Sequence, residues 1–175
     1  MKLNKNSINI YNQDCRIGLS ELQDNSLDLT ITSPPYNVGM EYDNYDDTIE
    51  RKDYIEFLKE VFTLVYNKSK EDGRLCINNA NSLNGADQIA FQVNNLMLEI
   101  GWKPYTFLIW DKNQTNSRTT WGSYMSASCP SFPTTFEFIW VYYKDSKKKL
   151  NPGKSTIKKQ EFIDWSLPMW RFPRI

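Results

Sequence analysis

Four consecutive residues, Ser33-Pro34-Pro35-Tyr36, have types and an order that could do chemistry. The two prolines lack N–H groups and hold their carbonyls on a stiff frame. The Ser33 hydroxyl adds a further oxygen that can accept a hydrogen bond. The Tyr36 ring offers a flat face on which a planar base can stack. Oxygens and a ring grouped in this way suit the exocyclic amine of a nucleobase.

Such an amine is a poor nucleophile, because its lone pair is delocalised into the base. Hydrogen bonds from both of its N–H groups to fixed oxygens favour a tetrahedral nitrogen and free the lone pair for attack, and no histidine is needed. An enzyme reaches this nitrogen in duplex DNA only by flipping the base out of the stack. The alternative is that Ser33-Pro34-Pro35-Tyr36 is only a stiff turn.

The residues around this tetrapeptide predict where it lies in the fold. The apolar run 27–31 is typical of a buried strand, and a strand cannot continue through two prolines. The chain must therefore leave the sheet at Ser33. Ligands of open α/β sheets bind at the carboxyl ends of the strands, so the predicted site lies at such an end.

Apolar periodicity along the chain predicts alternating strands and helices. The expected strands cover residues 7–11, 27–31, 74–78, 105–110 and 136–143, and the expected helices cover residues 16–23, 51–67 and 86–100. Asp72-Gly73 is expected to form a turn, residues 37–50 an acidic solvated loop, and the stretch from residue 144 a basic irregular tail. This order predicts an α/β fold with a doubly wound, mainly parallel sheet. The last strand is expected to pair antiparallel at or near an edge.

Composition bounds the remaining possibilities. The chain has 175 residues and no net charge, so it can form one compact domain, and its overall charge argues for no particular partner. The sequence has no histidine, which excludes Ser-His-Asp triads and zinc sites that contain histidine. The three cysteines lie far apart and indicate reduced thiols in a cytoplasmic protein. No apolar run is long enough to span a bilayer.

The tetrapeptide and several other segments, taken in order, resemble S-adenosylmethionine-dependent DNA amino-methyltransferases, a Rossmann-like family. The segments that carry this resemblance are Asp14-Cys15, residues 24–29, 32–39, 110–112, 117–123 and 137–139, and in the tail 162–165 and 170–173. The resemblance implies methyl transfer from S-adenosylmethionine to cytosine N4 or adenine N6 of double-stranded DNA, without a metal. It also implies a restriction-modification enzyme of a prokaryotic or phage cytoplasm, with no membrane partner.

The resemblance assigns roles to particular residues. Ser33, Pro34, Pro35 and Tyr36 would hold and activate the target amine, and the Ser form of the motif favours cytosine N4 while leaving adenine N6 open. Asp14 would lie near the adenine end of the cofactor, although an element-capping role is the alternative. The residues implied to contact DNA are Asn37, Lys112, Arg118, Trp121 and Ser123.

The sequence departs from the family in its glycines. In this subclass a glycine-rich cofactor loop follows the catalytic half, but the seven glycines here include no Gly-x-Gly pair. Residues 1–143 are therefore expected to be a catalytic α/β half-domain with a DNA-facing loop at 111–135, and residues 144–175 a separate basic tail. A second polypeptide would supply the loop if the chain is a split subunit, and a truncated gene or a fragment remains an alternative.

Two other functions stay open. The chain could be a catalytically inactive DNA-binding or regulatory fragment, since it lacks the cofactor loop. It could also be an RNA or protein amino-methyltransferase, but that class carries its cofactor loop before the motif, and none precedes Ser33. The lysines of the tail suit either a solvated linker or contacts with phosphates.

Overall fold

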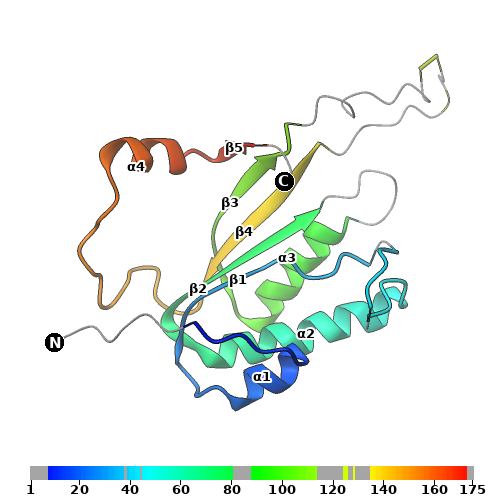
Figure 1. Cartoon of the computed structure of the whole chain (residues 1–175), viewed down its shortest axis with the longest axis horizontal. Coiled ribbons are helices and arrows are strands. Elements are labelled where there is room, and N and C mark those ends of the chain that lie inside the picture. Colours follow the sequence, from blue (N-terminus) through cyan, green and yellow to red (C-terminus); the bar gives the residue numbers. More distant parts are fainter. Residues whose placement is uncertain are drawn as a thin grey trace.

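The computed structural model describes residues 8–37, 39–43, 45–80, 88–113, 124–125, 128 and 135–172. Within these residues, five strands form one sheet with the order β1-β2-β4-β3-β5 (Figure 1). The strands are β1 (Leu27–Thr32), β2 (Ser69–Ala80), β3 (Lys103–Asp111), β4 (Phe136–Tyr143) and β5 (Met169–Arg171). The helices are α1 (Cys15–Glu21), α2 (Arg51–Lys68), α3 (Ile89–Ile100) and α4 (Lys159–Trp165).

Four of these strands run in one direction and β4 runs against them. β1 pairs parallel with β2, and β3 pairs parallel with β5, whereas β4 pairs antiparallel with both β2 and β3. The predicted α/β fold with a mainly parallel sheet is thus confirmed. The last predicted strand, β4, is antiparallel as expected, but it lies inside the sheet and not at an edge. Its nearly continuous apolar and aromatic sequence suits a strand with neighbours on both sides.

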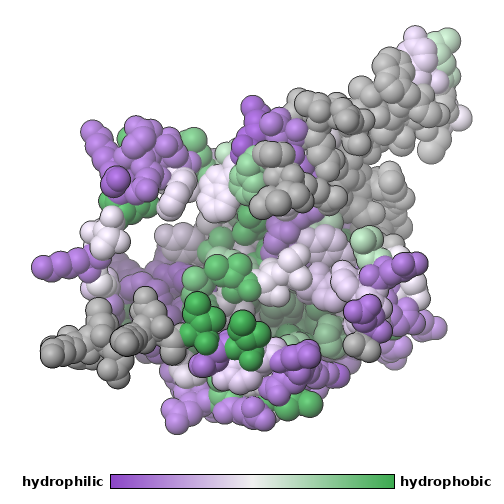
Figure 2. All heavy atoms as spheres, viewed as in Figure 1, coloured by the Kyte–Doolittle hydropathy of each residue, from purple (hydrophilic) through white to green (hydrophobic). Residues whose placement is uncertain are grey.

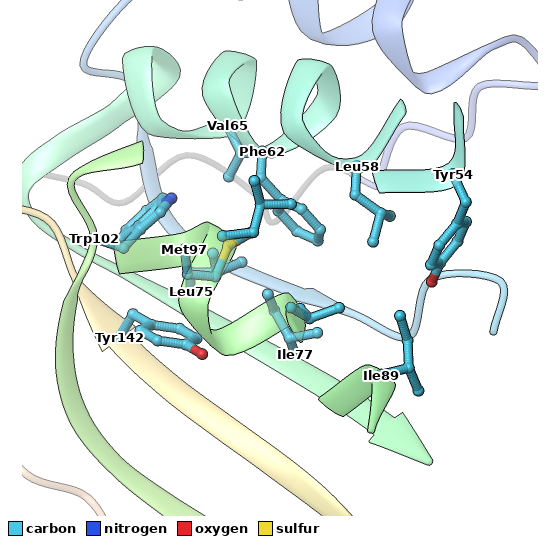
Figure 3. Packing of buried hydrophobic residues seen from close by; sticks show 12 residues of the cluster. Tyr54, Leu58, Phe62, Val65, Leu75, Ile77, Ile89, Met97, Trp102 and Tyr142 are labelled. Carbon is cyan, nitrogen blue, oxygen red and sulfur yellow. The ribbon is translucent and has the colours of Figure 1, made fainter. Parts of the chain in front are cut away.

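The hydrophobic core lies between the sheet and the helices α2 and α3. Apolar residues recur every three or four positions along α2, so one face of this helix meets the sheet. Figure 3 shows this packing, to which α2 contributes Tyr54, Leu58, Phe62 and Val65, and other elements contribute Leu75, Ile77, Ile89, Met97, Trp102 and Tyr142. No helix in the described part of the chain is both long and apolar enough to cross a bilayer.

The opposite face of the sheet keeps apolar side chains in contact with solvent. Leu29 and Ile31 of β1 alternate with the half-buried Thr30 and Thr32 and are 51% and 73% exposed. Ile8 and Ile10, which precede α1, are 87% and 91% exposed. In Figure 2 hydrophobic surface gathers over β1 and this preceding segment. β1 is also the end strand of the sheet, so its outer backbone edge has no strand beside it in the described residues.

Several segments differ from the predicted elements. Asp72 and Gly73 do not form a turn but lie within β2, where the register with β1 changes between Leu27 and Leu29. A Cβ at Gly73 would lie 2.8 Å from the carbonyl oxygen of Lys70, which explains the glycine in this bulge. A strand was expected over residues 7–11, and the described residues 8–11 belong to none in this structure.

The segment after residue 144 is also more regular than predicted. It contains α4 and the short strand β5, which extends the sheet beside β3. Figure 1 shows α4 apart from the helices that cover the core. Periodicity misses these elements because each is so short that its pattern is indistinct. The division into a domain of residues 1–143 and a tail of residues 144–175 remains a prediction.

Gly101 ends α3 and gives the first testable expectation. Its φ of 114° lies in the left-handed region, and an added Cβ would lie 3.4 Å from the ring of Tyr66. We expect Gly101→Ala to lower the free energy of unfolding by more than about 1 kcal/mol, measured by urea denaturation. Gly153→Ala is the matched control, because nothing lies within 4 Å of its Cβ position. Equal stability of the two variants would contradict this account of Gly101.

Candidate active site

The tetrapeptide Ser33-Pro34-Pro35-Tyr36 begins directly after β1, at its carboxyl end, as predicted. Pro34 is buried, Tyr36 is partly buried and Ser33 is exposed. The Tyr54 hydroxyl of α2 donates a hydrogen bond of 2.6 Å to the carbonyl of Pro35. The core helix therefore fixes the position of this corner, and one of its two proline carbonyls is already engaged by the protein.

The hydroxyl of Tyr36 is the centre of a polar cluster. It lies 2.9 Å from the Ser33 Oγ, 2.9 Å from the Asn78 Nδ2 and 3.1 Å from the Glu137 Oε2. Asn78 lies near the end of β2, and Glu137 lies near the start of β4. Because β4 runs antiparallel to β2, its first residues meet the last residues of β2, and Glu137 pairs with Ala80. The sheet topology thus brings these side chains together beside the end of β1.

Glu137 is held from its other side by a buried ion pair. Its Oε1 lies 2.6 Å from the Nζ of Lys112, and the two residues are 2% and 4% exposed. Burial alone would raise the pKa of Glu137, but hydrogen bonds from Lys112 and Asn78 outweigh it and lower the pKa below its ordinary value of 4.5. Glu137 is therefore a carboxylate at neutral pH. The predicted DNA contact of Lys112 does not fit this structure, because its ammonium lies inside the protein.

A cavity of about 380 Å³ opens beside this cluster. Its lining residues are Ser33, Pro34, Tyr36, Tyr42, Asn78, Trp110 and Glu137. The Trp110 ring stacks on Phe172 with 5.2 Å between the ring centroids, and its Nε1 donates to the Phe172 carbonyl at 3.0 Å. The cavity thus combines polar oxygens with aromatic walls, and its volume is typical of a small-ligand pocket.

A second cavity, of about 320 Å³, lies on the other side of the same corner. It is lined by Cys15, Leu19, residues 30–35, Phe57, Leu58, Val61, Phe62 and Val65. Ser33 and Pro34 line both cavities. The corner therefore separates a polar aromatic pocket from a mainly apolar one.

Asp14 caps the helix α1 next to the second cavity. Its Oδ1 accepts a hydrogen bond of 2.8 Å from the backbone N–H of Arg16, and its Oδ2 lies 2.7 Å from the guanidinium of the same residue. Hydrogen bonds from Arg16 lower the pKa of Asp14 to about 2. The structure thus places Asp14 in the capping role weighed from the sequence. Its neighbour Cys15 lines the second cavity, and a cofactor contact of Asp14 remains a prediction.

Asn37 is held by the segment that follows it. Its backbone N–H donates to Asp47 at 2.9 Å, and its Nδ2 donates to the Ile49 carbonyl at 2.9 Å. Asp47 is only 2% exposed and also accepts a hydrogen bond from the N–H of Met40. The described part of this acidic segment is thus anchored at Asp47, while most of its residues stay exposed, as expected of a solvated loop. The DNA contact of Asn37 remains a prediction, and Arg118, Trp121 and Ser123 lie outside the described residues.

The residues of this site to which the sequence assigned no role are Tyr42, Asn78, Trp110 and Glu137, although Trp110 and Glu137 lie in segments that carry the family resemblance. Two of them have a recognisable pattern, because Glu137 interrupts an apolar aromatic strand and Asn78 follows the apolar run of another. A polar residue at such a position is uncommon unless it has a partner inside the protein. Their meeting depends on the order of strands in the sheet, which the sequence pattern did not reveal.

Comparison with known proteins agrees with this geometry. The N6/N4 DNA methylase family model matches residues 27–172. The chain is 41% identical over 155 residues to the type II methyltransferase M.MjaVI of Methanocaldococcus jannaschii. These residues are 87% of this chain and 80% of that protein. The chain belongs to the N6/N4 DNA methylase family. A second relative, M.HpaI of Haemophilus parainfluenzae, is 31% identical over 101 residues, or 58% of this methylase and 31% of the relative.

Solved methylase structures share the fold. A protein of Thermus thermophilus described as a DNA modification methylase has a TM-score of 0.68 at 20% identity over 90% of this chain. The cytosine-N4-specific PvuII DNA methyltransferase has a TM-score of 0.65 at 14% identity over 94% of this chain. The methylase chain spans 63% and 57% of these two structures, respectively. Both likenesses show a common Rossmann-like methyltransferase fold.

Proposed function

We propose that this methylase chain forms the target-base half of an S-adenosylmethionine-dependent DNA amino-methyltransferase. The observation that carries the proposal is the position of Ser33-Pro34-Pro35-Tyr36 at the end of β1, where it opens into the cavity with Asn78 and Trp110. Type II methyltransferases among its relatives support a restriction-modification role. The Ser form of the motif favours cytosine N4 as the methylated atom, and adenine N6 is the second possibility.

The structure supports a specific set of contacts with a flipped base. The Ser33 hydroxyl and the Pro34 carbonyl would accept hydrogen bonds from the two N–H groups of the amine, since the Pro35 carbonyl already binds Tyr54. Trp110 and Tyr42 would offer their rings to the base. With both N–H groups bound to oxygens, the amine nitrogen can turn its lone pair toward the methyl donor.

The chain supplies only part of a cofactor site. S-adenosylmethionine, when bound, supplies a methyl group on a positively charged sulfur. The apolar cavity that includes Cys15 and Pro34 would form one wall of its site, and Asp14 would lie near its adenine. The remaining wall needs a glycine-rich loop, and the sequence has no Gly-x-Gly pair. We propose that a further polypeptide segment supplies this loop.

Titration calorimetry with S-adenosylmethionine tests this division of the site. We expect no stoichiometric binding to the chain alone, and binding once a segment with the family's glycine-rich cofactor loop is added. Methylation of DNA by the assembled protein would then confirm the activity. Tight binding by the chain alone would contradict the half-site proposal. Assembly without methylation would instead favour an inactive DNA-binding or regulatory fragment.

The exposed edge at β1 is the proposed contact surface for that segment. Ile31 is 73% exposed on the open face of this edge strand, and burial of an isoleucine contributes about 1.5–3 kcal/mol. We expect Ile31→Asp to weaken association with the loop-bearing segment by at least about tenfold, as measured by calorimetry. Leu98→Asp is the matched control, because Leu98 is 44% exposed but lies on α3. Equal affinity of the two variants would contradict docking at β1.

A further inference from the structure

The hydrogen bonds around Tyr36 have a direction that the charges determine. A carboxylate only accepts hydrogen bonds, and the Asn78 Nδ2 only donates them. Tyr36 must therefore donate its single proton to Glu137, at 3.1 Å, and accept from Asn78, at 2.9 Å. A second possible acceptor, the backbone carbonyl oxygen of Asn78, lies farther from the Tyr36 hydroxyl, at 3.5 Å, and carries no charge.

The direction of the hydrogen bonds at Tyr36 also determines the direction of the hydrogen bond between Tyr36 and Ser33. The Tyr36 hydroxyl has no second proton to give, so in the 2.9 Å contact between these residues the Ser33 Oγ must be the donor. With its proton turned to Tyr36, the Ser33 oxygen presents only lone pairs to the cavity. An exposed serine without this constraint could turn its proton toward the cavity just as readily.

We propose that Glu137, fixed by Lys112, is a positioning residue that orders the hydrogen bonds from Ser33 through Tyr36 so that the Ser33 oxygen faces the target amine as an acceptor. This inference rests on the proposed function of the cavity. Glu137 acts through Tyr36 and need not touch the substrate. The ion pair with Lys112, at 2.6 Å, keeps the carboxylate charged and in place.

Glu137→Gln should remove the charge that fixes the order of these bonds. In the wild type Lys112 donates to one oxygen of Glu137, and the other oxygen accepts from the Asn78 Nδ2 at 2.5 Å and from Tyr36 at 3.1 Å. A glutamine that keeps its carbonyl oxygen beside Lys112 turns its NH₂ group toward Asn78 and Tyr36, so Tyr36 loses its charged acceptor and can donate to Ser33 instead. Ser33 is then free to direct its proton into the cavity, where the amine also carries protons.

The test is a double-mutant cycle in the assembled enzyme. We expect Glu137→Gln and Tyr36→Phe each to lower kcat by roughly 10- to 100-fold, with KM for DNA changed less. The double variant should be no slower than the slower single variant, because both changes break the same chain of bonds. Tyr142→Phe is the control, since this buried hydroxyl binds Asn94 at 3.0 Å in the core, and its kcat should equal that of the wild type.

A second readout needs neither cofactor nor DNA. Burial, with the negative charge of Glu137, raises the pKa of Tyr36 to about 12. Glu137 contacts this hydroxyl, Lys112 pairs with the other oxygen of Glu137, and Tyr42 lines the same cavity. Glu137→Gln should therefore lower the pKa of Tyr36. This pKa is measured by NMR titration of chains with labelled tyrosine, in which Tyr36→Phe identifies the resonance of Tyr36.

The outcomes separate this inference from the proposed function. A wild-type assembly that fails to methylate DNA overturns the proposed function. An active wild type with unchanged kcat in Glu137→Gln, or with additive losses in the double variant, overturns the positioning role of Glu137. Unchanged titration of Tyr36 in Glu137→Gln overturns it as well. A lowered Tyr36 pKa together with non-additive losses in kcat supports it.

Discussion

Ser33→Ala is expected to lower kcat of the assembled methyltransferase by about 100-fold or more. Removing one positioned hydrogen-bonding group from an active site has effects of this size. The Ser33 oxygen is one of the two acceptors proposed to activate the amine, and alanine leaves the N–H group facing it without a partner. Ser33 is exposed, so the change should leave the thermal unfolding of the chain nearly unaltered.

The measurement is the rate of methyl transfer from labelled S-adenosylmethionine to duplex DNA. Ser20→Ala is the matched control, because Ser20 is also an exposed serine but binds the Ile17 carbonyl within α1. Tyr36→Ala should be at least as damaging as Ser33→Ala, since it removes both the ring and the hydroxyl. Near-normal activity in both Ser33→Ala and Tyr36→Ala would show that the site lies elsewhere.

Lys112→Met is expected to cause the largest loss of stability, about 3–5 kcal/mol in the free energy of unfolding. It removes one partner of a buried ion pair and leaves the Glu137 carboxylate without its cation. Lys112→Met/Glu137→Leu should recover most of this loss, because it replaces both charges by apolar groups. Lys70→Met is the control, since Lys70 pairs with Asp28 at the surface and should change stability by less than about 1 kcal/mol.

The pH dependence of these variants carries a further expectation. The folded state lowers the pKa of Glu137 below 4.5, so the wild type gains stability from this group above that pH and loses it as the pH falls. In Lys112→Met, protonation instead relieves the buried charge. The stability difference between wild type and Lys112→Met, measured by urea denaturation, should therefore shrink as the pH falls toward 4. A difference that is constant with pH would contradict a charged Glu137.

The sequence was sufficient to predict the α/β fold and the corner at Ser33. These depend on local features, namely apolar periodicity and two prolines that must end a strand. The family followed from the resemblance of several segments taken in order. It was not sufficient to place β4 between β2 and β3, since strand order follows from contacts between distant segments. The partners of Tyr36 depend on that order, because only the antiparallel course of β4 brings Glu137 beside Asn78.

Lys112 shows a related difficulty. The resemblance implied that Lys112 contacts DNA. The acid that pairs with it instead lies 25 positions later in the sequence, at Glu137. Gly73 is similar, since Asp-Gly favours a turn locally, while the pairing of β2 with β1 turns the same residues into a bulge. In both cases a tertiary contact overrides the local preference.

The central claim is that the corner Ser33-Pro34-Pro35-Tyr36 binds the target amine within a site that a glycine-rich segment completes. Its most direct test is transfer of a labelled methyl group from S-adenosylmethionine to DNA by the chain with and without that segment. We predict methylation of an exocyclic amine only when both parts are present, and its loss in Ser33→Ala. Methylation by the complete assembly that is unaffected by Ser33→Ala would contradict the claim.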